Sequence, residues 1–150
     1  MNAKVFNQTH ILFDDGAKTQ EEAFRVIANF AFEKGFVASE EFYYEGLKAR
    51  EVESTTGFKD QIAIPHSKHA TVLKPGLFLV KFSHAIPWKA LDSQPIKVAF
   101  ALTIPEEGAK EHLKLLSLIA RKLIDDEFRE GVLKEESPEK IADIVNQIDF

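Results

Sequence analysis

The fold class is decided by the stretch Ile96-Lys97-Val98-Ala99-Phe100-Ala101-Leu102-Thr103-Ile104, which is apolar nearly throughout and is stopped by Pro105. Such a run is typical of a strand that is buried on both faces of a sheet. Two further apolar runs, at residues 61–64 and 77–82, have the same character. Because helical patterns alternate with these strands, the chain is expected to be a layered α/β domain.

Helices are expected between and after these strands. Thr19-Gln20-Glu21-Glu22 is a capping box, in which Thr19 begins a helix and Glu22 supports its first turn. Gly35 suits the position that ends this helix. Further helices are expected from Ser39 to about residue 52, after Gly108, over residues 126–133, and from Ser137 with Pro138 at its first position.

The helix after Gly108 has a broad apolar stripe, and a short strand over residues 9–13 is expected near the beginning of the chain. The breadth of the stripe indicates packing on more than one side. Its inward face is expected to carry Leu113, Leu116, Ala120 and Leu123, with Leu115, Leu118 and Ile119 beside them.

Composition excludes several classes of protein. The chain has 150 residues, which favours a single domain over residues 1–150. With 45% hydrophobic and 29% charged residues, it is neither disordered nor collagen-like. Its formal net charge is -5, so no nucleic-acid binding is expected. The absence of cysteine excludes a disulfide framework, a thiolate zinc site and a cysteine nucleophile. No signal peptide or membrane-spanning run is found, so a cytoplasmic protein is expected.

His66 stands out because it directly follows the apolar stretch Gln61-Ile62-Ala63-Ile64-Pro65. We expect it just past the end of a buried strand, and ligands of α/β sheets bind at the carboxyl ends of strands. Pro65 restricts the backbone at this point, which would present the imidazole in a defined direction. The alternative is an ordinary histidine at the end of a strand.

His112 and Arg50 are two further candidate site residues. His112 lies near the start of the helix after Gly108, where free N–H groups and the helix dipole favour an anion such as phosphate. The alternative is a solvated polar residue. Arg50 is expected near the end of the helix from Ser39, where its planar guanidinium can hold phosphoryl oxygens. The alternative is an arginine that only contacts the last carbonyls of its helix.

Other kinds of site are not expected. His66 and His69 form an H-x-x-H pair, but the further ligands of a metal site are missing, so a histidine–metal protein is only a minor alternative. The patterns of P-loops, dinucleotide-binding turns and hydrolase nucleophile elbows are absent.

Several stretches in a fixed order carry a family resemblance. They are Arg50-Glu51, Thr56-Gly57, Ile62-Ala63-Ile64-Pro65-His66, Ile86-Pro87-Trp88-Lys89-Ala90-Leu91-Asp92-Ser93-Gln94-Pro95-Ile96, Phe100-Ala101-Leu102-Thr103-Ile104-Pro105 and His112-Leu113-Lys114-Leu115-Leu116. Together they resemble the fructose/mannitol-type enzyme IIA domain of the bacterial sugar phosphotransferase system, over nearly the whole chain. The chain departs from the family at Phe58-Lys59-Asp60-Gln61, where a glycine-rich turn is usual.

The resemblance implies a mixed central sheet with helices on both faces and a phosphotransferase with a phosphohistidine intermediate. His66 would accept a phosphoryl group from the phosphohistidine of the carrier HPr and pass it to a cysteine of enzyme IIB. The membrane enzyme IIC would then move the sugar, which the enzyme IIA itself never binds. Arg50 and His112 match the other active-site residues of the family. No cofactor and no metal are implied.

The chemistry of phosphoryl transfer suits these residues. A histidine attacks through a neutral ring nitrogen, which an ordinary pKa of about 6.5 allows at neutral pH. The other ring nitrogen is expected to donate to a carbonyl or a carboxylate. Arg50, His112 and the N–H groups after His66 can stabilise the transferred charge without a metal. The same motifs occur in the nitrogen-regulatory branch of the family, whose phosphorylation state alters binding to a regulator or transporter, so this role is the alternative.

Overall fold

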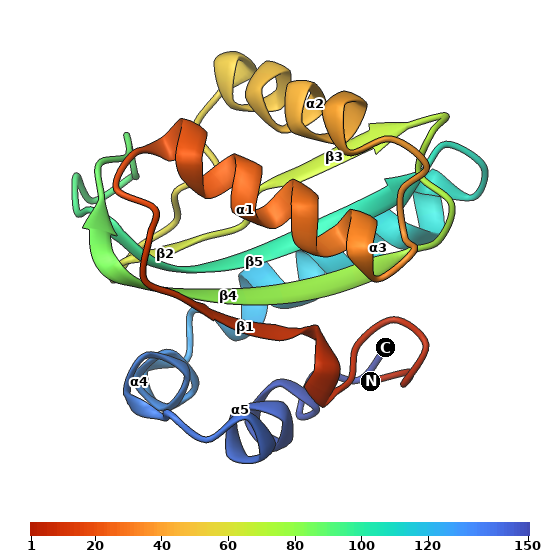
Figure 1. Ribbon diagram of the computed structural model, residues 1–150. Coiled ribbons are helices and arrows are strands. Elements are labelled where there is room, and N and C mark those ends of the chain that lie inside the picture. Colours follow the sequence, from red (N-terminus) through yellow and green to blue (C-terminus); the bar gives the residue numbers. More distant parts are fainter.

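Five strands form one mixed sheet in the computed structural model, which describes residues 1–150 (Figure 1). The strands are β1 (Ile11–Asp14), β2 (Ile62–Ala63), β3 (His66–His69), β4 (Gly76–Ile86) and β5 (Ile96–Pro105). Their order is β1, β4, β5 and β2, and β3 also pairs with β5. β4 and β5 are antiparallel, whereas β1 runs parallel to β4, and β2 and β3 run parallel to β5.

Helices cover both faces of the sheet (Figure 1). One face carries α1 (Gln20–Glu33) and α2 (Glu40–Glu53), and the other carries α3 (Ala109–Lys122), α4 (Asp126–Lys134) and α5 (Pro138–Val145). The expected α/β class, with a mixed sheet between helices, is confirmed. No helix combines the length and the apolar composition that crossing a bilayer requires.

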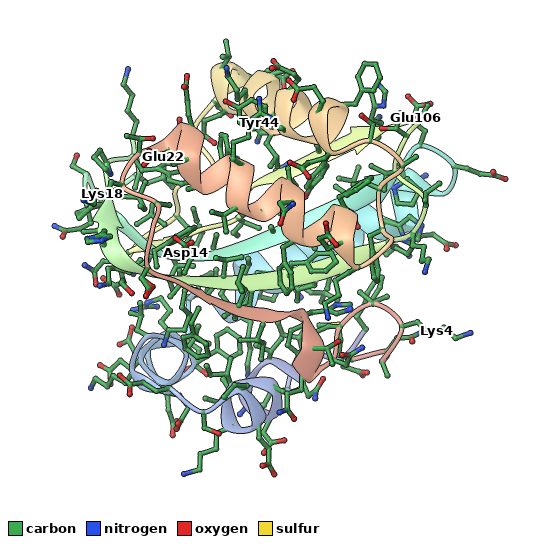
Figure 2. All side chains as sticks on the ribbon, viewed as in Figure 1. Lys4, Asp14, Lys18, Glu22, Tyr44 and Glu106 are labelled. Atoms are coloured by element: carbon green, nitrogen blue, oxygen red, sulfur yellow. The ribbon has the colours of Figure 1, made fainter.

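β5 is buried on both faces because its side chains alternate between two apolar cores, which fill the layers on either side of the sheet (Figure 2). Ala99 and Ala101 belong to the core under α1 and α2. Val98, Phe100 and Leu102 belong to the core under α3, α4 and α5. Burying a side chain of the size of Leu or Phe contributes about 1.5–3 kcal/mol. The strand therefore stabilises both halves of the molecule.

Capping residues set the helix boundaries. Thr19 Oγ1 accepts a hydrogen bond from the N–H of Glu22 at 3.1 Å, and Ser39 Oγ accepts one from the N–H of Phe42 at 3.1 Å. Gly35, with φ of 81°, adopts the left-handed conformation that follows a helix end. The observed limits of α2 and α4 differ by one residue from those expected.

The strand expected at residues 61–64 is shorter, and β2 holds only Ile62 and Ala63. Pro65 has no N–H and interrupts the ladder, although its carbonyl oxygen still accepts a hydrogen bond from the N–H of Leu102 at 3.0 Å. Pairing resumes at β3, with His66 opposite Leu102. His66 therefore lies just past the end of β2, as expected, and it also opens a second strand, β3, alongside β5.

The expected inward face of α3 is wrong at Leu113, whose exposed fraction is 39%. The residues that α3 buries repeat at every fourth position, as Leu115, Ile119 and then Leu123. Residues two apart lie on nearly opposite sides of a helix, so Leu113 turns outward when Leu115 enters the core.

The limits of two strands also differ from those expected. β1 begins only at Ile11, because residues 8–10 form a short 3-10 helix, capped by Asn7. β4 extends beyond residue 82 to Ile86, with an irregularity in its pairing between Lys81 and Ile86.

Candidate active site

A glycine lets α2 lie directly on β3. A Cβ atom at Gly46 would come within 2.1 Å of Ser67 Oγ, a separation that real atoms do not tolerate. With serine at position 67, glycine at position 46 permits this close approach of helix and strand. The approach places the last turns of α2 beside the first residues of β3, where Arg50 meets His66.

Both ring nitrogens of His66 have partners. Nδ1 lies 2.8 Å from the carbonyl oxygen of Ile64, which can only accept, so Nδ1 carries the proton. Nε2 lies 3.1 Å from Arg50 Nε, which can only donate. These two contacts assign a neutral imidazole with its lone pair on Nε2.

Burial also favours the neutral form of the His66 ring. The pKa of His66 is lowered, mainly because the half-buried ring loses hydration in its charged form. The hydrogen bond to Ile64 raises the pKa, whereas the positive charge of Arg50 lowers it further. His66 is therefore neutral at neutral pH, as a nucleophile must be.

Arg50 makes two contacts near the end of α2. Its Nη1 donates to the carbonyl oxygen of Ser54 at 2.8 Å and so caps the end of α2. Its Nε points at His66 Nε2 instead. The bond to Ser54 thus holds the guanidinium in place while its Nε contacts the imidazole ring.

An open cavity of about 540 Å³ surrounds this pair. Arg50 and His66 line it together with Lys68, Glu53 and the outward-facing Leu113. Two cationic side chains beside a neutral imidazole favour an anion over a cation. The size and openness of the cavity suit a small group presented from outside.

His112 lies outside the hydrogen bonds of this pair. It lies in the first turns of α3, and no hydrogen bond joins it to His66 or Arg50. Its Nδ1 is buried and has no hydrogen-bond partner. The neighbouring Gly108 has φ of 75°, and a Cβ atom there would lie 3.4 Å from His112 Nε2.

His69, the second histidine of the H-x-x-H pair, is engaged elsewhere. Its Nδ1 lies 2.9 Å from Thr71 Oγ1, and its ring stacks on Phe42 with centroids 5.4 Å apart. No group of three or more His, Cys, Asp or Glu side chains is placed to hold a metal ion. His69 also lines the cavity, and we call its position the rim.

The loop that departs from the family pattern adopts a backbone typical of glycine. Asp60 has φ of 50° and Gln61 has φ of 69°. The N–H of Asp60 donates to Asp92 Oδ2 at 2.9 Å, and its carboxylate accepts from Arg129 Nε at 2.7 Å. The left-handed conformation costs a residue other than glycine about 1–2 kcal/mol. These hydrogen bonds stabilise the turn although it contains no glycine.

Two residues that hold the segments around the site, Gly46 and Glu51, had only weak signals in the sequence. Gly46 could have been noticed because glycine inside a helix costs about 1 kcal/mol and often marks a close contact. Glu51 was visible only as the neighbour of Arg50, and its hydrogen bonds join segments that are far apart in the sequence.

Known proteins resemble the chain along nearly its whole length. It is 30% identical over 138 residues to the PTS system fructose-specific EIIA component of Haloferax volcanii, covering 92% of this chain and 90% of that protein. The crystal structure of the nitrogen regulatory protein IIA-Ntr from Neisseria meningitidis has a TM-score of 0.85 and 27% identity, covering 95% of this chain and 97% of that one. The fold also recurs in the complex of enzyme IIAMTL and phosphorylated enzyme IIBMTL from Escherichia coli, with a TM-score of 0.79, 18% identity and coverage of 95% and 97%.

Residues 4–148 match the protein family described as phosphoenolpyruvate-dependent sugar phosphotransferase system, EIIA 2. The match covers the sheet, both helical layers and the cavity with Arg50 and His66. It confirms the resemblance seen in the sequence. The chain belongs to the EIIA 2 family of the phosphoenolpyruvate-dependent sugar phosphotransferase system, which makes it a phosphoryl carrier of the EIIA type.

Proposed function

We propose that His66 accepts a phosphoryl group from the phosphohistidine of HPr and passes it to a cysteine of enzyme IIB. The observation that carries this proposal is the lone pair on His66 Nε2. It follows from the hydrogen bond that Nδ1–H donates to the carbonyl oxygen of Ile64. Nε2 forms a bond to phosphorus while the bond to the donor nitrogen breaks, and the electron pair stays on that nitrogen. A cysteine thiolate then attacks the phosphorus, and the pair returns to His66 Nε2.

Arg50 has a part in both steps. In the structure its Nε–H covers the Nε2 lone pair, so the guanidinium withdraws as the donor approaches. It can then donate to the phosphoryl oxygens through parallel N–H groups. Its bond to Ser54 keeps it close during this movement. Such preorganised donors stabilise charge where it develops.

His112 is proposed as the second stabilising group. Its buried Nδ1 has no partner, and a buried lone pair costs less than a buried N–H, which places the proton on Nε2. The ring can then donate from Nε2 to a phosphoryl oxygen. The outward-facing Leu113 beside it lines the cavity of His66.

HPr and enzyme IIB are proposed to dock in turn on the rim of this cavity. Leu113 and Phe42 are exposed there, by 39% and 56% respectively, and Phe42 stacks on the rim residue His69. Transient encounters use small interfaces of this kind. The likeness to a chain of the IIAMTL–IIBMTL complex supports enzyme IIB as a partner. In this proposal the chain is cytoplasmic and exchanges phosphoryl groups only with HPr and enzyme IIB. It therefore reaches the membrane enzyme IIC only through enzyme IIB and does not bind the sugar.

A regulatory role is the second candidate, favoured by the likeness to the nitrogen regulatory protein IIA-Ntr. The same phosphohistidine would then control binding to a regulator or a transporter. The two roles separate when the phosphorylated protein is mixed with its cognate enzyme IIB: transport requires that the label moves on. A label that stays on the protein favours regulation.

The first experiment is incubation with enzyme I, HPr and phosphoenolpyruvate, followed by intact mass measurement at alkaline pH. The proposal predicts the gain of one acid-labile phosphoryl group, which depends on HPr. No gain in mass contradicts it.

A further inference from the structure

We propose that Glu51 is a positioning residue, which fixes both hydrogen bonds of the His66 ring through one carboxylate. This inference rests on the proposed function for its effect on transfer, but its effect on the ring is independent of it. Glu51 directly follows Arg50 in the last turn of α2. It does not line the cavity around His66.

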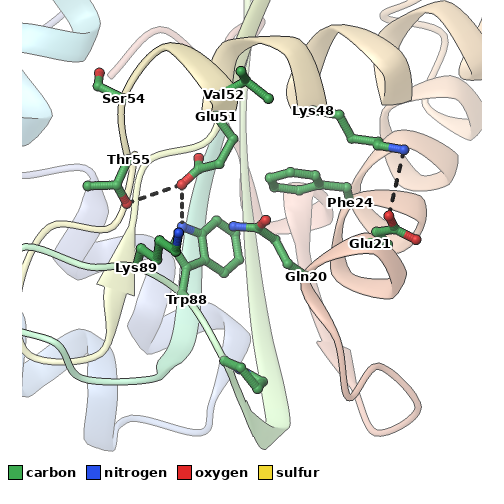
Figure 3. Close-up of a pocket in the computed structure, with 11 residues that line it drawn as sticks. Gln20, Glu21, Phe24, Lys48, Glu51, Val52, Ser54, Thr55, Trp88 and Lys89 are labelled. Carbon is green, nitrogen blue, oxygen red and sulfur yellow. Dashed lines mark hydrogen bonds and ion pairs between the residues drawn. The ribbon is translucent and has the colours of Figure 1, made fainter.

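The carboxylate of Glu51 accepts hydrogen bonds from four donor groups of two segments, of which Figure 3 draws those of Thr55 and Trp88. Oε1 accepts from Trp88 Nε1 at 2.8 Å and from Thr55 Oγ1 at 3.1 Å. The N–H of Thr56 donates to both oxygens, at 3.1 and 3.2 Å, and Thr56 Oγ1 donates to Oε2. Charge-assisted bonds of this kind are about twice as strong as neutral ones.

These bonds continue to the His66 ring through Thr56. The carbonyl oxygen of Thr56 accepts from the N–H of Ile64 at 2.9 Å. The carbonyl oxygen of the same Ile64 accepts from His66 Nδ1 at 2.8 Å. Glu51 thus fixes Thr56, and Thr56 fixes Ile64, whose carbonyl oxygen orients the His66 ring.

The second ring contact starts from the same turn of α2. Arg50 is the residue next to Glu51 and donates to His66 Nε2. If the end of α2 loosened from residues 55–56, Arg50 and Ile64 would no longer be fixed relative to each other. The tautomer and direction of the ring would then be set by weaker constraints.

No cation neutralises Glu51, since none of the salt bridges of the structure includes it. It lines a different cavity, of about 730 Å³, with Trp88, Lys48 and Phe24 (Figure 3). The two cavities share α2, whose residues line both. The negative charge of Glu51 raises the pKa of His66, against the larger effect of burial.

The test is Glu51→Gln, with Glu45→Gln as the control that removes the same charge from an exposed position of α2. An amide cannot accept from every donor now on the carboxylate, because one of its oxygens becomes NH₂. The readouts are the imidazole ¹⁵N shifts of His66, and the single-turnover rate from phosphorylated HPr over pH and over donor concentration.

We expect Glu51→Gln to show a mixture of His66 tautomers and a rate lower by roughly 10- to 100-fold at saturating donor, the range expected for misplacement of a reacting group. The half-saturating concentration of HPr stays unchanged, and the midpoint of the pH–rate profile moves to lower pH. Glu51→Asp, which keeps the carboxylate, restores part of the rate. Glu45→Gln behaves like wild type.

An unchanged His66 tautomer and an unchanged rate per folded molecule in Glu51→Gln would overturn the proposal. If Glu51→Gln fails to fold, Thr56→Val removes a single donor of the same set and is expected to shift the tautomers in the same direction by less; no shift overturns the proposal. Failure of HPr to label the wild type would refute the proposed function, whereas the tautomer measurement would still decide the role of Glu51.

Discussion

Arg50 Nε and His66 Nε2 lie 3.1 Å apart, so the guanidinium covers the lone pair through which His66 would attack. In the resting protein the proposed nucleophile is thereby neutral and shielded. Arrival of a phosphoryl group offers Arg50 a better acceptor than an imidazole nitrogen. One side chain can therefore protect the ring before transfer and stabilise the phosphoryl group after it.

Substitution of Arg50 tests this double role. We expect Arg50→Ala to slow transfer by roughly 100- to 1000-fold, the effect of losing one preorganised donor to a developing charge. Arg50→Lys restores only part of the rate, because a point charge cannot replace the planar fork. The pKa of His66 rises in Arg50→Ala, since the nearby positive charge lowers it in the wild type. Single-turnover kinetics and an NMR titration of His66 measure both effects, and wild-type values of both would refute the role.

Substitution of His112 tests whether this residue stabilises the phosphoryl group during transfer or carries it. His112→Ala is expected to slow transfer while the label still ends on His66. His112→Gln retains more of the rate, because its amide N–H can replace the imidazole donor. Kinetics combined with mapping of the labelled residue at alkaline pH gives the answer. A wild-type rate in His112→Ala would make this histidine an ordinary residue of α3.

The packing of α2 on β3 predicts a coupled pair of substitutions. Gly46→Ala places a methyl group against Ser67 Oγ, and overpacking of this kind costs about 1–3 kcal/mol. It is also expected to slow transfer, because α2 carries Arg50. Ser67→Ala removes the clashing oxygen and should restore most of the stability and rate in the double variant. Denaturant unfolding and single-turnover rates of both variants measure this, and purely additive effects would contradict it.

His10 predicts how stability depends on pH. The residue is 3% exposed and its ring stacks on Phe78. Burial lowers the pKa of His10 despite the hydrogen bond from Nδ1 to the carbonyl oxygen of Leu77. The unfolded chain then binds a proton at a pH where the folded chain does not, so the free energy of unfolding falls as the pH drops below about 6.5.

His10→Phe is expected to flatten this dependence between neutral pH and the lowered pKa. Because the pKa of His66 is also lowered, the comparison is made in a His66→Ala background. Urea unfolding at several pH values measures the slope. An equal slope with His10 and with Phe at this position would show that His10 does not contribute.

Patterns within short segments predicted much of the fold. Apolar runs located β4 and β5, and the caps Thr19 and Ser39 located α1 and α2, because these signals act between near neighbours. The orientation of Leu113 was not predictable in this way, since it depends on how α3 is rotated against the sheet. The sequence predicted that the strand ends at Pro65. It did not predict that pairing with β5 resumes at His66, because this depends on how far β5 extends beside the chain.

The sequence predicted which residues belong to the candidate site better than it predicted how they are arranged. His66 and Arg50 were selected from the sequence, and the structure brings them into contact. The partner of Nδ1 proved to be Ile64, two residues before His66, which sequence left open. The bonds of Glu51 to Trp88 and Thr56 depend on long-range folding and had no local signal.

The most direct test of the central claim is to identify the nitrogen that carries the phosphoryl group. The protein, labelled with ¹⁵N at histidine, is phosphorylated by enzyme I, HPr and phosphoenolpyruvate, and ¹H–¹⁵N and ³¹P spectra are recorded at alkaline pH beside those of His66→Ala. The account predicts a single phosphohistidine, at His66 Nε2, and no label in His66→Ala. A phosphoryl group on Nδ1, on His112, or on His66→Ala would contradict it.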